Sequence, residues 1–281
     1  MSFLDCRACL AAAAFAAVFS VAPAVAETSL RGAMEQGGVV IGTTEAGSRV
    51  TLDGKEIPVS DNGIFLLGFG RDAKSMKLVI TAPDGSKENR ALAIEKRKWD
   101  IQRINGLPPK QVTPDAATLE RIKKENALIG STRRKQTKTP GGEGFESGFV
   151  QPVDGRISGV FGSQRILNGQ PRSPHSGLDI AAPTGTVMVA TADGTVRMTQ
   201  PDLYYTGQTV MIDHGHGLFS LYAHMSSIDV TDGQTVRRGQ PIGKVGATGR
   251  VTGPHLHWGI SWNGANVDPQ TVLRVLLPVE R

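Results

Sequence analysis

Short apolar runs separated by Asp-Gly and Asn-Gly pairs are the feature that most restricts the folds open to this chain. Such pairs favour the tight turns of β-hairpins, because both residues tolerate the left-handed backbone conformation that these turns need. The pairs recur at Asp53-Gly54, Asn62-Gly63, Asp84-Gly85, Asp193-Gly194, Asp232-Gly233 and Asn263-Gly264, and the chain has 34 glycines among 281 residues. The pattern therefore predicts a mainly β protein built from many short strands.

The apolar runs fall into two regions. In residues 35–106 the runs are 39–41, 50–52, 64–67 and 78–80. In residues 149–281 they are 187–190, 196–198, 209–212, 219–222, 242–245 and 256–260. The first region predicts a small β domain without histidine, which we interpret as a structural or docking module. The second predicts a compact antiparallel β domain.

Residues 107–148, between these regions, combine a predicted helix with a polar linker. Thr113-Pro114-Asp115 is typical of a helix start, since it offers a capping hydroxyl, proline at the first helical position and an acid in the first turn. Only a thin apolar stripe follows, and we expect the helix to end near Gly130. Residues 130–148 are polar, basic and rich in glycine, which predicts an exposed linker.

The first 26 residues do not belong to the predicted fold. An uncharged apolar run from Leu10 to Ala26 ends in Ala24-Val25-Ala26, and small residues at these positions suit a signal peptidase. We interpret residues 1–26 as a signal peptide. The run is too short for a membrane span, and Pro23 interrupts it. We therefore expect an exported protein without a membrane span.

Cysteine and charge narrow the chemistry further. Cys6 and Cys9 both lie inside the predicted signal peptide, so any metal site of the mature chain must consist of His, Asp and Glu. The formal charge of +5 persists after cleavage, because Arg7 and Asp5 leave together. This charge would draw an exported protein to anionic polymers or membrane surfaces. No nucleic-acid-binding motif accompanies it, so we expect no nucleic-acid partner.

All six histidines lie between residues 175 and 257, and this clustering indicates a chemical role. His175 and Asp179 are four residues apart in a segment where Pro174, Gly177 and Pro183 disfavour a helix. In an extended segment, residues at even separations share a face. Both side chains can therefore point into one site.

A second motif, His255-Leu256-His257, lies in another predicted strand. Its two imidazoles would project from the same side, about 6–7 Å apart, while Leu256 turns into the core. His224 follows Tyr222 by two residues and would share a strand face with it. Each motif is weak alone, but their occurrence together in one β domain is considerably stronger.

Two imidazoles and a carboxylate are a typical catalytic zinc set, because the fourth tetrahedral position stays open for water. His224, lying between the two motifs, is a candidate proton carrier or transition-state stabiliser. His214 and His216 instead flank Gly215 in a turn-like segment, and we expect structural roles for them.

These motifs resemble those of the M23 peptidases, the lysostaphin-type or LytM-type metallopeptidases. The family's HxxxD motif is present as His175 to Asp179, its middle histidine as His224, and its HxH motif as His255 to His257. The intervening segments 177–183, 192–196, 210–215 and 246–249 agree as well. The resemblance covers roughly residues 149 to 277.

The resemblance implies a LytM-type antiparallel β-sheet with a groove around Zn²⁺. It implies zinc ligands at His175, Asp179 and His257, and a catalytic pair at His224 and His255. The chain has no HExxH motif, so one of these two imidazoles would take the proton of the attacking water and the other would stabilise the oxyanion.

The implied activity is hydrolysis of peptide bonds in peptidoglycan stem peptides or cross-links. We expect this activity in the periplasm or outside the cell, with the chemistry confined to residues 149–281. Residues 35–106 are then available to a regulatory partner. Tyr204 or Tyr205 lies where relatives carry a groove tyrosine.

Three other functions fit parts of the pattern. A catalytically silent regulator of cell-wall amidases would lack a ligand or a catalytic histidine, and none is missing. A wall-binding module with a structural zinc would need a fourth ligand, for which His224 is the only contender. A carboxypeptidase for D-Ala-D-Ala termini would carry an SxHxxGxxxD motif, and His175 and Asp179 are too close for it. We therefore favour the active endopeptidase.

Overall fold

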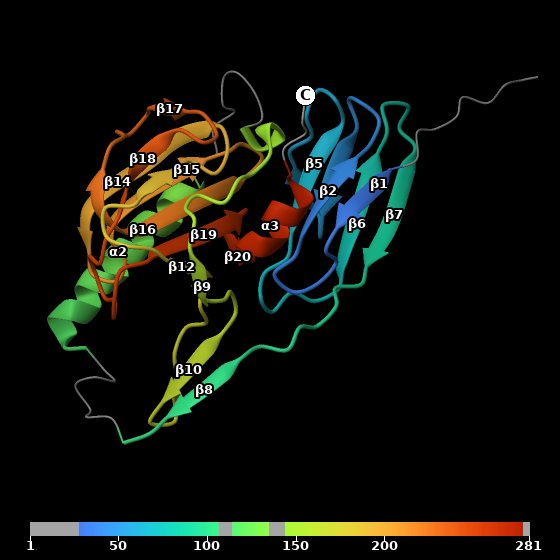
Figure 1. Ribbon diagram of the computed structural model, residues 1–281. Coiled ribbons are helices and arrows are strands. Elements are labelled where there is room, and N and C mark those ends of the chain that lie inside the picture. Colours follow the sequence, from blue (N-terminus) through green and yellow to red (C-terminus); the bar gives the residue numbers. More distant parts are fainter. Residues whose placement is uncertain (1–27, 107–113, 135–143, 278–281) are drawn as a thin grey trace, which may run out of the picture.

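The structure, a computed structural model, describes residues 28–106, 114–134 and 144–277 (Figure 1). It is mainly β with antiparallel sheets, which confirms the predicted fold class. The predicted signal peptide, residues 1–26, lies outside the described residues. In the described part of the chain, no helix is both long and apolar enough to cross a membrane.

The N-terminal β region consists of a three-stranded sheet in the order β1-β2-β5 and a four-stranded sheet in the order β4-β3-β6-β7. Its strands are β1 (Ser29–Gly32), β2 (Val39–Thr43), β3 (Arg49–Leu52), β4 (Lys55–Ile57), β5 (Ile64–Gly68), β6 (Met76–Thr81) and β7 (Lys87–Leu92). The four predicted apolar runs lie in β2, β3, β5 and β6. Asp53 (φ 47°) and Gly54 (φ 77°) both adopt the left-handed conformation expected of the turn between β3 and β4.

The C-terminal β region is built on a ten-stranded sheet whose central path runs β17-β14-β15-β16-β19-β12-β9, with β13, β18 and β20 paired at its sides. Its strands are β9 (Arg156–Gly159), β12 (Gly177–Ala181), β13 (Val187–Val189), β14 (Gly194–Leu203), β15 (Gly207–Asp213), β16 (Leu218–Ile228), β17 (Thr235–Val236), β18 (Pro241–Val245), β19 (Leu256–Trp262) and β20 (Ala265–Val267). The predicted apolar runs of this region fall on these strands, except that run 187–190 extends one residue beyond β13.

The large sheet buries both of its faces. On one face Tyr222 and Trp258 are fully buried in the main hydrophobic core. On the opposite face Phe219 and Leu221 belong to a smaller apolar cluster. His257 lies directly opposite Ala223, a member of this smaller cluster, in the register of β19 and β16. The histidine site therefore lies on the face of the smaller cluster.

Helix α2 (Ala116–Arg134) covers part of that same face, where Ile129 packs against the smaller cluster (Figure 1). The helix differs from its predicted bounds at both ends. Asp115 caps it, because its Oδ1 accepts a hydrogen bond from Thr118 N at 2.7 Å. The helix also continues through Gly130 to Arg134, since burial of Thr132 against the sheet stabilises the last turn.

The predicted linker, residues 130–148, is therefore helical at its start. Its far end forms a 3₁₀ helix, η1 (Gly144–Ser147), in which Phe145 is buried. A cluster of apolar neighbours thus overrides the polar, glycine-rich composition that predicted an exposed segment. The residues between these two parts lie outside the described chain.

Helix α3 (Pro269–Val275) lies between the N-terminal region and the large sheet, in contact with β1, β2, β12 and β19 (Figure 1). Asp268 caps this helix and forms an ion pair with Arg97, whose Nη1 lies 2.8 Å from Asp268 Oδ2. Only 4% of the Asp268 side chain is exposed. Gly68 allows a close approach, since a Cβ there would lie 2.7 Å from Trp262 Cβ. One hydrophobic core runs through both regions.

A third sheet, in the order β11-β10-β8, also joins the two regions. Strand β8 (Ile101–Ile104) pairs in parallel with β10 (Gln164–Leu167), which pairs with β11 (Gln170–Pro171). Trp99, just before β8, packs edge-on against Phe161. These contacts brace the segment that leads to His175.

Candidate metal centre and active site

Three side chains from the two predicted motifs converge on one point. Asp179 and His257 are register partners on β12 and β19, and His175 lies just before β12. His257 Nδ1 lies 2.8 Å from Asp179 Oδ1, and His175 Nε2 lies 3.0 Å from both of these atoms. Among the described His, Cys, Asp and Glu residues, these three form a group whose ligand atoms all lie within 4.8 Å.

The protonation state of His175 indicates that a positive charge is needed between these three atoms. Its Nδ1 lies 2.9 Å from the carbonyl oxygen of Val160, which can only accept, so Nδ1 carries the proton. In the neutral ring, Nε2 then has a lone pair directed at the Asp179 carboxylate and at His257. A carboxylate oxygen and imidazole lone pairs repel one another at such distances unless a proton or a metal cation lies between them.

A zinc ion fits this donor set. Two imidazole nitrogens and one carboxylate oxygen are usual zinc ligands, and in a tetrahedral site they lie about 3.4 Å apart. The observed separations of 2.8 and 3.0 Å need only a small outward movement to reach that value. Three protein ligands would leave one tetrahedral position open.

The pKa values of Asp179, His175 and His257 are shifted because these side chains are buried close to one another. Burial raises the pKa of Asp179, but hydrogen bonds from His175 and His257 overcome this effect and lower it strongly. Burial lowers the pKa of His175, but the hydrogen bond and charge of Asp179 prevail and raise it. Burial also lowers the pKa of His257, so that ring favours the neutral form that binds a metal.

His224 reaches the site through an irregularity in β16. Gln208 pairs with Met225, whereas Val210 pairs with Tyr222, so β16 carries an extra residue here. His224 itself has a φ of 63°. This β-bulge turns the ring towards the site and away from the core face of Tyr222. The prediction that both residues share one face is therefore wrong, because regular alternation stops at the bulge.

The rings of His224 and His255 lie side by side with their centres 4.7 Å apart. His224 Nδ1 lies 2.9 Å from Thr248 O, and His255 Nδ1 lies 2.9 Å from Gly253 O. Both rings thus keep the Nδ1 proton and leave Nε2 with a lone pair. Burial, helped by the neighbouring histidines, lowers the pKa of His224 to about 4.

The five sequence-predicted residues therefore meet at one place. His255 Nε2 lies 3.8 Å from Asp179 Oδ1, and the ring of His224 lies 6.1 Å from that of His257. The distances separate a tight group of three from a more distant pair. This geometry suits three ligands with two bases beside them.

Sequence reasoning missed several groups that orient these side chains. The carbonyl groups of Val160, Thr248 and Gly253 fix ring orientation but leave no trace in side-chain identity. Ser176 Oγ lies 3.4 Å from His257 Nε2, and its place beside His175 was the only available signal. Gly159 lies against the Asp179 carboxylate, where a Cβ would be 2.4 Å from Oδ2.

Tyr204 and Tyr205 lie in the turn between β14 and β15, with ring centres 5.0 Å apart. The guanidinium of Arg250 lies 4.3 Å from the ring centre of Tyr205. Tyr205 is therefore bound to the loop that also carries Thr248, the partner of His224.

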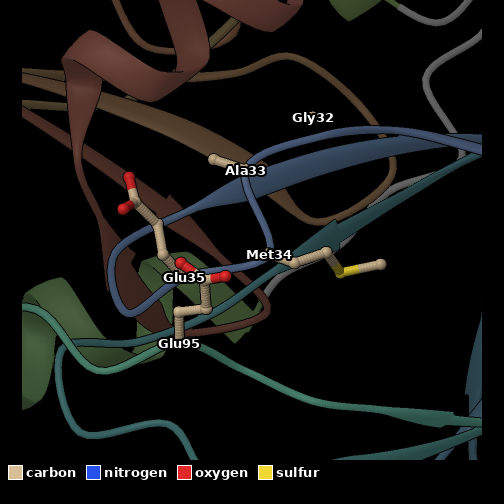
Figure 2. A pocket seen from close by; sticks show the side chains of 5 residues that line it. All are labelled: Gly32, Ala33, Met34, Glu35 and Glu95. Atoms are coloured by element: carbon tan, nitrogen blue, oxygen red, sulfur yellow. The ribbon is translucent and has the colours of Figure 1, made fainter.

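Two other features lie apart from the site. His214 is fully buried and bonded to Asp193 O and Ser220 Oγ, in keeping with the structural role expected of it. A hollow of about 420 Å³ lies in the N-terminal region, where Figure 2 shows Glu35 and Glu95 side by side. None of the five site residues lines it.

Comparison with known proteins places this geometry in a family. The model of peptidase family M23 matches residues 173–269, which contain all five site residues. A crystal structure from Pseudomonas aeruginosa, described as a peptidase M23, is 34% identical. It aligns with 85% of this chain and 94% of its own, with a TM-score of 0.62. The chain therefore belongs to peptidase family M23.

Curated relatives match the C-terminal half. The peptidoglycan DD-endopeptidase ShyA of Vibrio cholerae is 43% identical over 131 residues, which are 45% of this chain and 30% of ShyA. The DD-carboxypeptidase/endopeptidase Mpg of Neisseria meningitidis is 47% identical over 129 residues, again 45% of this chain and 30% of the relative. The match thus spans less than a third of the length of either relative.

Proposed function

We propose that this protein is an exported zinc endopeptidase that hydrolyses peptide bonds in peptidoglycan stem peptides or cross-links. One observation carries the proposal. His175 Nε2, His257 Nδ1 and Asp179 Oδ1 converge within 3.0 Å of one another, beside two imidazoles that each present an unprotonated Nε2. That combination matches a hydrolytic metal site with its own proton acceptors.

In this proposal His175, Asp179 and His257 hold the zinc. Bound there, zinc would lower the pKa of a water molecule to about 7 and polarise the carbonyl of the scissile bond. The carbonyl of Val160 holds the His175 ring in the tautomer that places its Nε2 lone pair at the metal, and Ser176 Oγ, 3.4 Å from His257 Nε2, can accept a hydrogen bond from that nitrogen.

His224 and His255 are the proposed acid–base pair. Because the Nδ1 proton of each ring is engaged by a backbone carbonyl, each ring can accept a proton only at Nε2. One ring takes the proton of the attacking water at Nε2 and passes it to the leaving amine. The other ring, once protonated at Nε2, donates to the developing oxyanion. The low pKa of His224, about 4, keeps that ring neutral at neutral pH, with a lone pair on Nε2.

The substrate proposal draws on the relatives. The printed names of ShyA and Mpg describe peptidoglycan DD-endopeptidase and DD-carboxypeptidase/endopeptidase activities. An enzyme that acts on this polymer must leave the cytoplasm, which agrees with a signal peptide at residues 1–26, whether the protein stays in the periplasm or is secreted. We assign the catalysis to residues 149–281 and propose residues 35–106 as an accessory domain open to a regulatory partner.

A catalytically silent regulator would be expected to lack one of the five site residues. Removal of a terminal residue from a stem peptide is a second candidate activity, favoured by the name of Mpg. The two activities give different products. An endopeptidase converts cross-linked muropeptide dimers into monomers, whereas a carboxypeptidase shortens monomers by one residue.

Digestion of purified sacculi, followed by mass spectrometry of the muropeptides, tests the proposal. We expect the zinc-loaded protein to convert dimers into monomers, a chelator to stop the reaction, and added zinc to restore it. His255→Ala serves as a control with the same fold. Unchanged dimers in the presence of zinc would refute the endopeptidase, and shortened monomers without loss of dimers would favour the carboxypeptidase.

A further inference from the structure

Helix α2 precedes the large sheet in sequence, yet it packs on the face that carries the metal centre. Its Ile122 is buried, and Ile129 packs against the apolar cluster of Phe219 and Leu221. The hydroxyl of Thr132, one turn further, is buried beside Met198 of β14. The helix is thus fixed relative to the strands that carry His224.

Glu125 and its neighbour Arg121 make polar contacts between this helix and the sheet. Its Oε2 accepts a hydrogen bond from Tyr204 N at 2.8 Å, and its Oε1 accepts one from Arg121 Nε at 2.6 Å. Arg121 Nη2 in turn donates to the Asp202 carbonyl at 2.9 Å. Only 15% of the Glu125 side chain is exposed, so water cannot readily replace these partners. The helix therefore holds the β14–β15 turn at two points.

This turn is bonded directly to His224. The carbonyl of Thr206 accepts the backbone N–H of His224 at 2.8 Å. That bond helps to hold His224 in its left-handed conformation, with a φ of 63°, which is costly for a residue with a side chain. A shift of the turn would therefore act first on the backbone of His224.

The same turn also supports the loop that orients the His224 ring. Tyr205 O accepts a hydrogen bond from Arg250 N at 3.1 Å, and Thr248 Oγ1 accepts one from Gln208 N at 2.9 Å. Thr248 O is the acceptor for His224 Nδ1. Both the backbone and the ring of His224 thus depend on a turn that Glu125 anchors.

We propose that Glu125 is a positioning residue, which acts through the Tyr204–Thr206 turn to fix the orientation and the Nδ1–H tautomer of His224. Glu125 lies on α2 and does not touch the metal centre, so its effect is indirect. The consequence for turnover rests on the function proposed above. The effect on His224 itself does not, because it follows from the hydrogen bonds alone.

Three variants of the zinc-loaded protein test this assignment. Glu125→Ala removes both contacts of the carboxylate. Glu125→Gln keeps an oxygen that can accept from Tyr204 N. Glu120→Ala is the matched control, because it removes the same charge from an exposed position of the same helix. Circular dichroism and zinc content establish that each variant is folded and loaded.

The first measurement is NMR of His224. We expect Glu125→Ala to speed exchange of the His224 amide proton by about tenfold or more, as local opening becomes easier. We also expect the ring nitrogens to shift towards a mixture of tautomers. Glu120→Ala should match the wild type, and Glu125→Gln should lie between them. A His224 that is unchanged in Glu125→Ala would overturn the proposal.

The second measurement is turnover of a cross-linked muropeptide dimer. We expect Glu125→Ala to lower kcat by about tenfold with little change in KM, since a misplaced catalytic group costs rate more than binding. A rate equal to that of Glu120→Ala would overturn the proposed link to catalysis. A wild type without activity would refute the proposed function alone, and the NMR comparison would still decide the role of Glu125.

If Glu125→Ala does not fold, Arg121→Ala carries the same test, because its side chain is 44% exposed and its loss leaves no buried cavity. It removes the contact to Asp202 and one support of Glu125. We expect a smaller change of the same kind at His224. An unchanged His224 in Arg121→Ala would count against the proposal.

Discussion

His257 Nδ1 and Asp179 Oδ1 lie 2.8 Å apart because the two residues are direct partners in the antiparallel register of β19 and β12. The pairing of two strands far apart in sequence thus builds two sides of the candidate metal centre from backbone hydrogen bonds. His175 completes the group from just before the start of β12. A slip of one residue would turn His257 to the opposite face, so the register of this pair is a condition for the site.

His257 and His255 should fail in different ways when replaced by alanine. We expect His257→Ala to lose zinc and thermal stability, since bound metal stabilises only the folded state. His255→Ala should keep zinc and the fold, while its turnover falls by about 10²–10⁴, the usual scale for a positioned acid–base group. Zinc content, melting temperature and muropeptide release on the two variants measure this difference.

Asp179→Ala and His224→Ala extend the comparison. The first should behave like His257→Ala, and the second like His255→Ala. If His224 and His255 act as a unit, the double variant should lose less than the product of the two single effects. A metal-free His255 variant beside a zinc-loaded His257 variant would reverse the two roles.

Gly159→Ala should weaken zinc binding although Gly159 is no ligand. An added Cβ would lie 2.4 Å from Asp179 Oδ2, so the carboxylate must move away from its position. We expect the Kd for zinc to rise by about 10- to 100-fold, the scale seen when a group that orients a ligand is disturbed. Competition with a chromogenic chelator measures it.

Gly70→Ala is the control for this substitution. A Cβ there meets only Ala265 Cβ, at 3.7 Å, which is ordinary contact. Its zinc affinity should match the wild type. Wild-type affinity in Gly159→Ala as well would mean that the carboxylate has room to move without leaving the metal.

The sequence predicted most of this fold because its strongest signals are local. The apolar runs and the Asp-Gly turns give the positions of the strands, and the spacing of His255 and His257 gives their common direction. Strands with little apolar character, such as β7, β8 and β10, carry no such signal. Their pairing depends on neighbours that are distant in sequence.

The candidate site was predicted by residue type, but its geometry was not. The bulge at His224 adds one residue to β16, so the His224 side chain lies on the opposite face from the one that regular alternation predicts. The role inferred for Glu125 depends on contact with a turn about 80 positions away. The expectation that residues 149–281 act alone stays a prediction, and the core shared with residues 30–94 is what a truncated chain would lose.

Arg97→Ala should destabilise the protein by about 1–3 kcal/mol. It leaves the carboxylate of Asp268, 4% exposed, without its ion-pair partner, and the partial exposure of Arg97 moderates the loss. Chemical denaturation measures the change. Arg49→Ala is the control, because its ion pair with Glu56 is largely exposed and should contribute little. Equal stability of the two variants would show that the Arg97–Asp268 contact does not secure the N-terminal region.

Acid should destabilise the fold through His214. A continuous chain of hydrogen bonds can run from Thr191 N through Tyr222 and Ser220 to His214 Nε2, while His214 Nδ1 donates to Asp193 O at 2.7 Å. The neutral ring therefore satisfies both of its nitrogens. Burial lowers the pKa of His214 from 6.5 to about 4.

The direction of the effect follows from this shift. The unfolded chain takes up a proton at His214 below a pH of about 6.5, and the folded chain only below about 4. Stability is therefore complete above the higher value and is lost as the pH falls towards the lower one, by up to about 3 kcal/mol. We expect His214→Gln to remove this part of the pH dependence.

Urea unfolding of the wild type and His214→Gln at several pH values between 7 and 4 tests the prediction. Both proteins keep the five site residues, so any acid-induced loss of a bound zinc ion should cancel in the difference between them. The wild type should lose more stability than the variant over this range, even if the variant starts from a lower value. Parallel curves would mean that His214 is protonated in the folded state at the same pH as in the unfolded chain, and that its burial has no electrostatic cost.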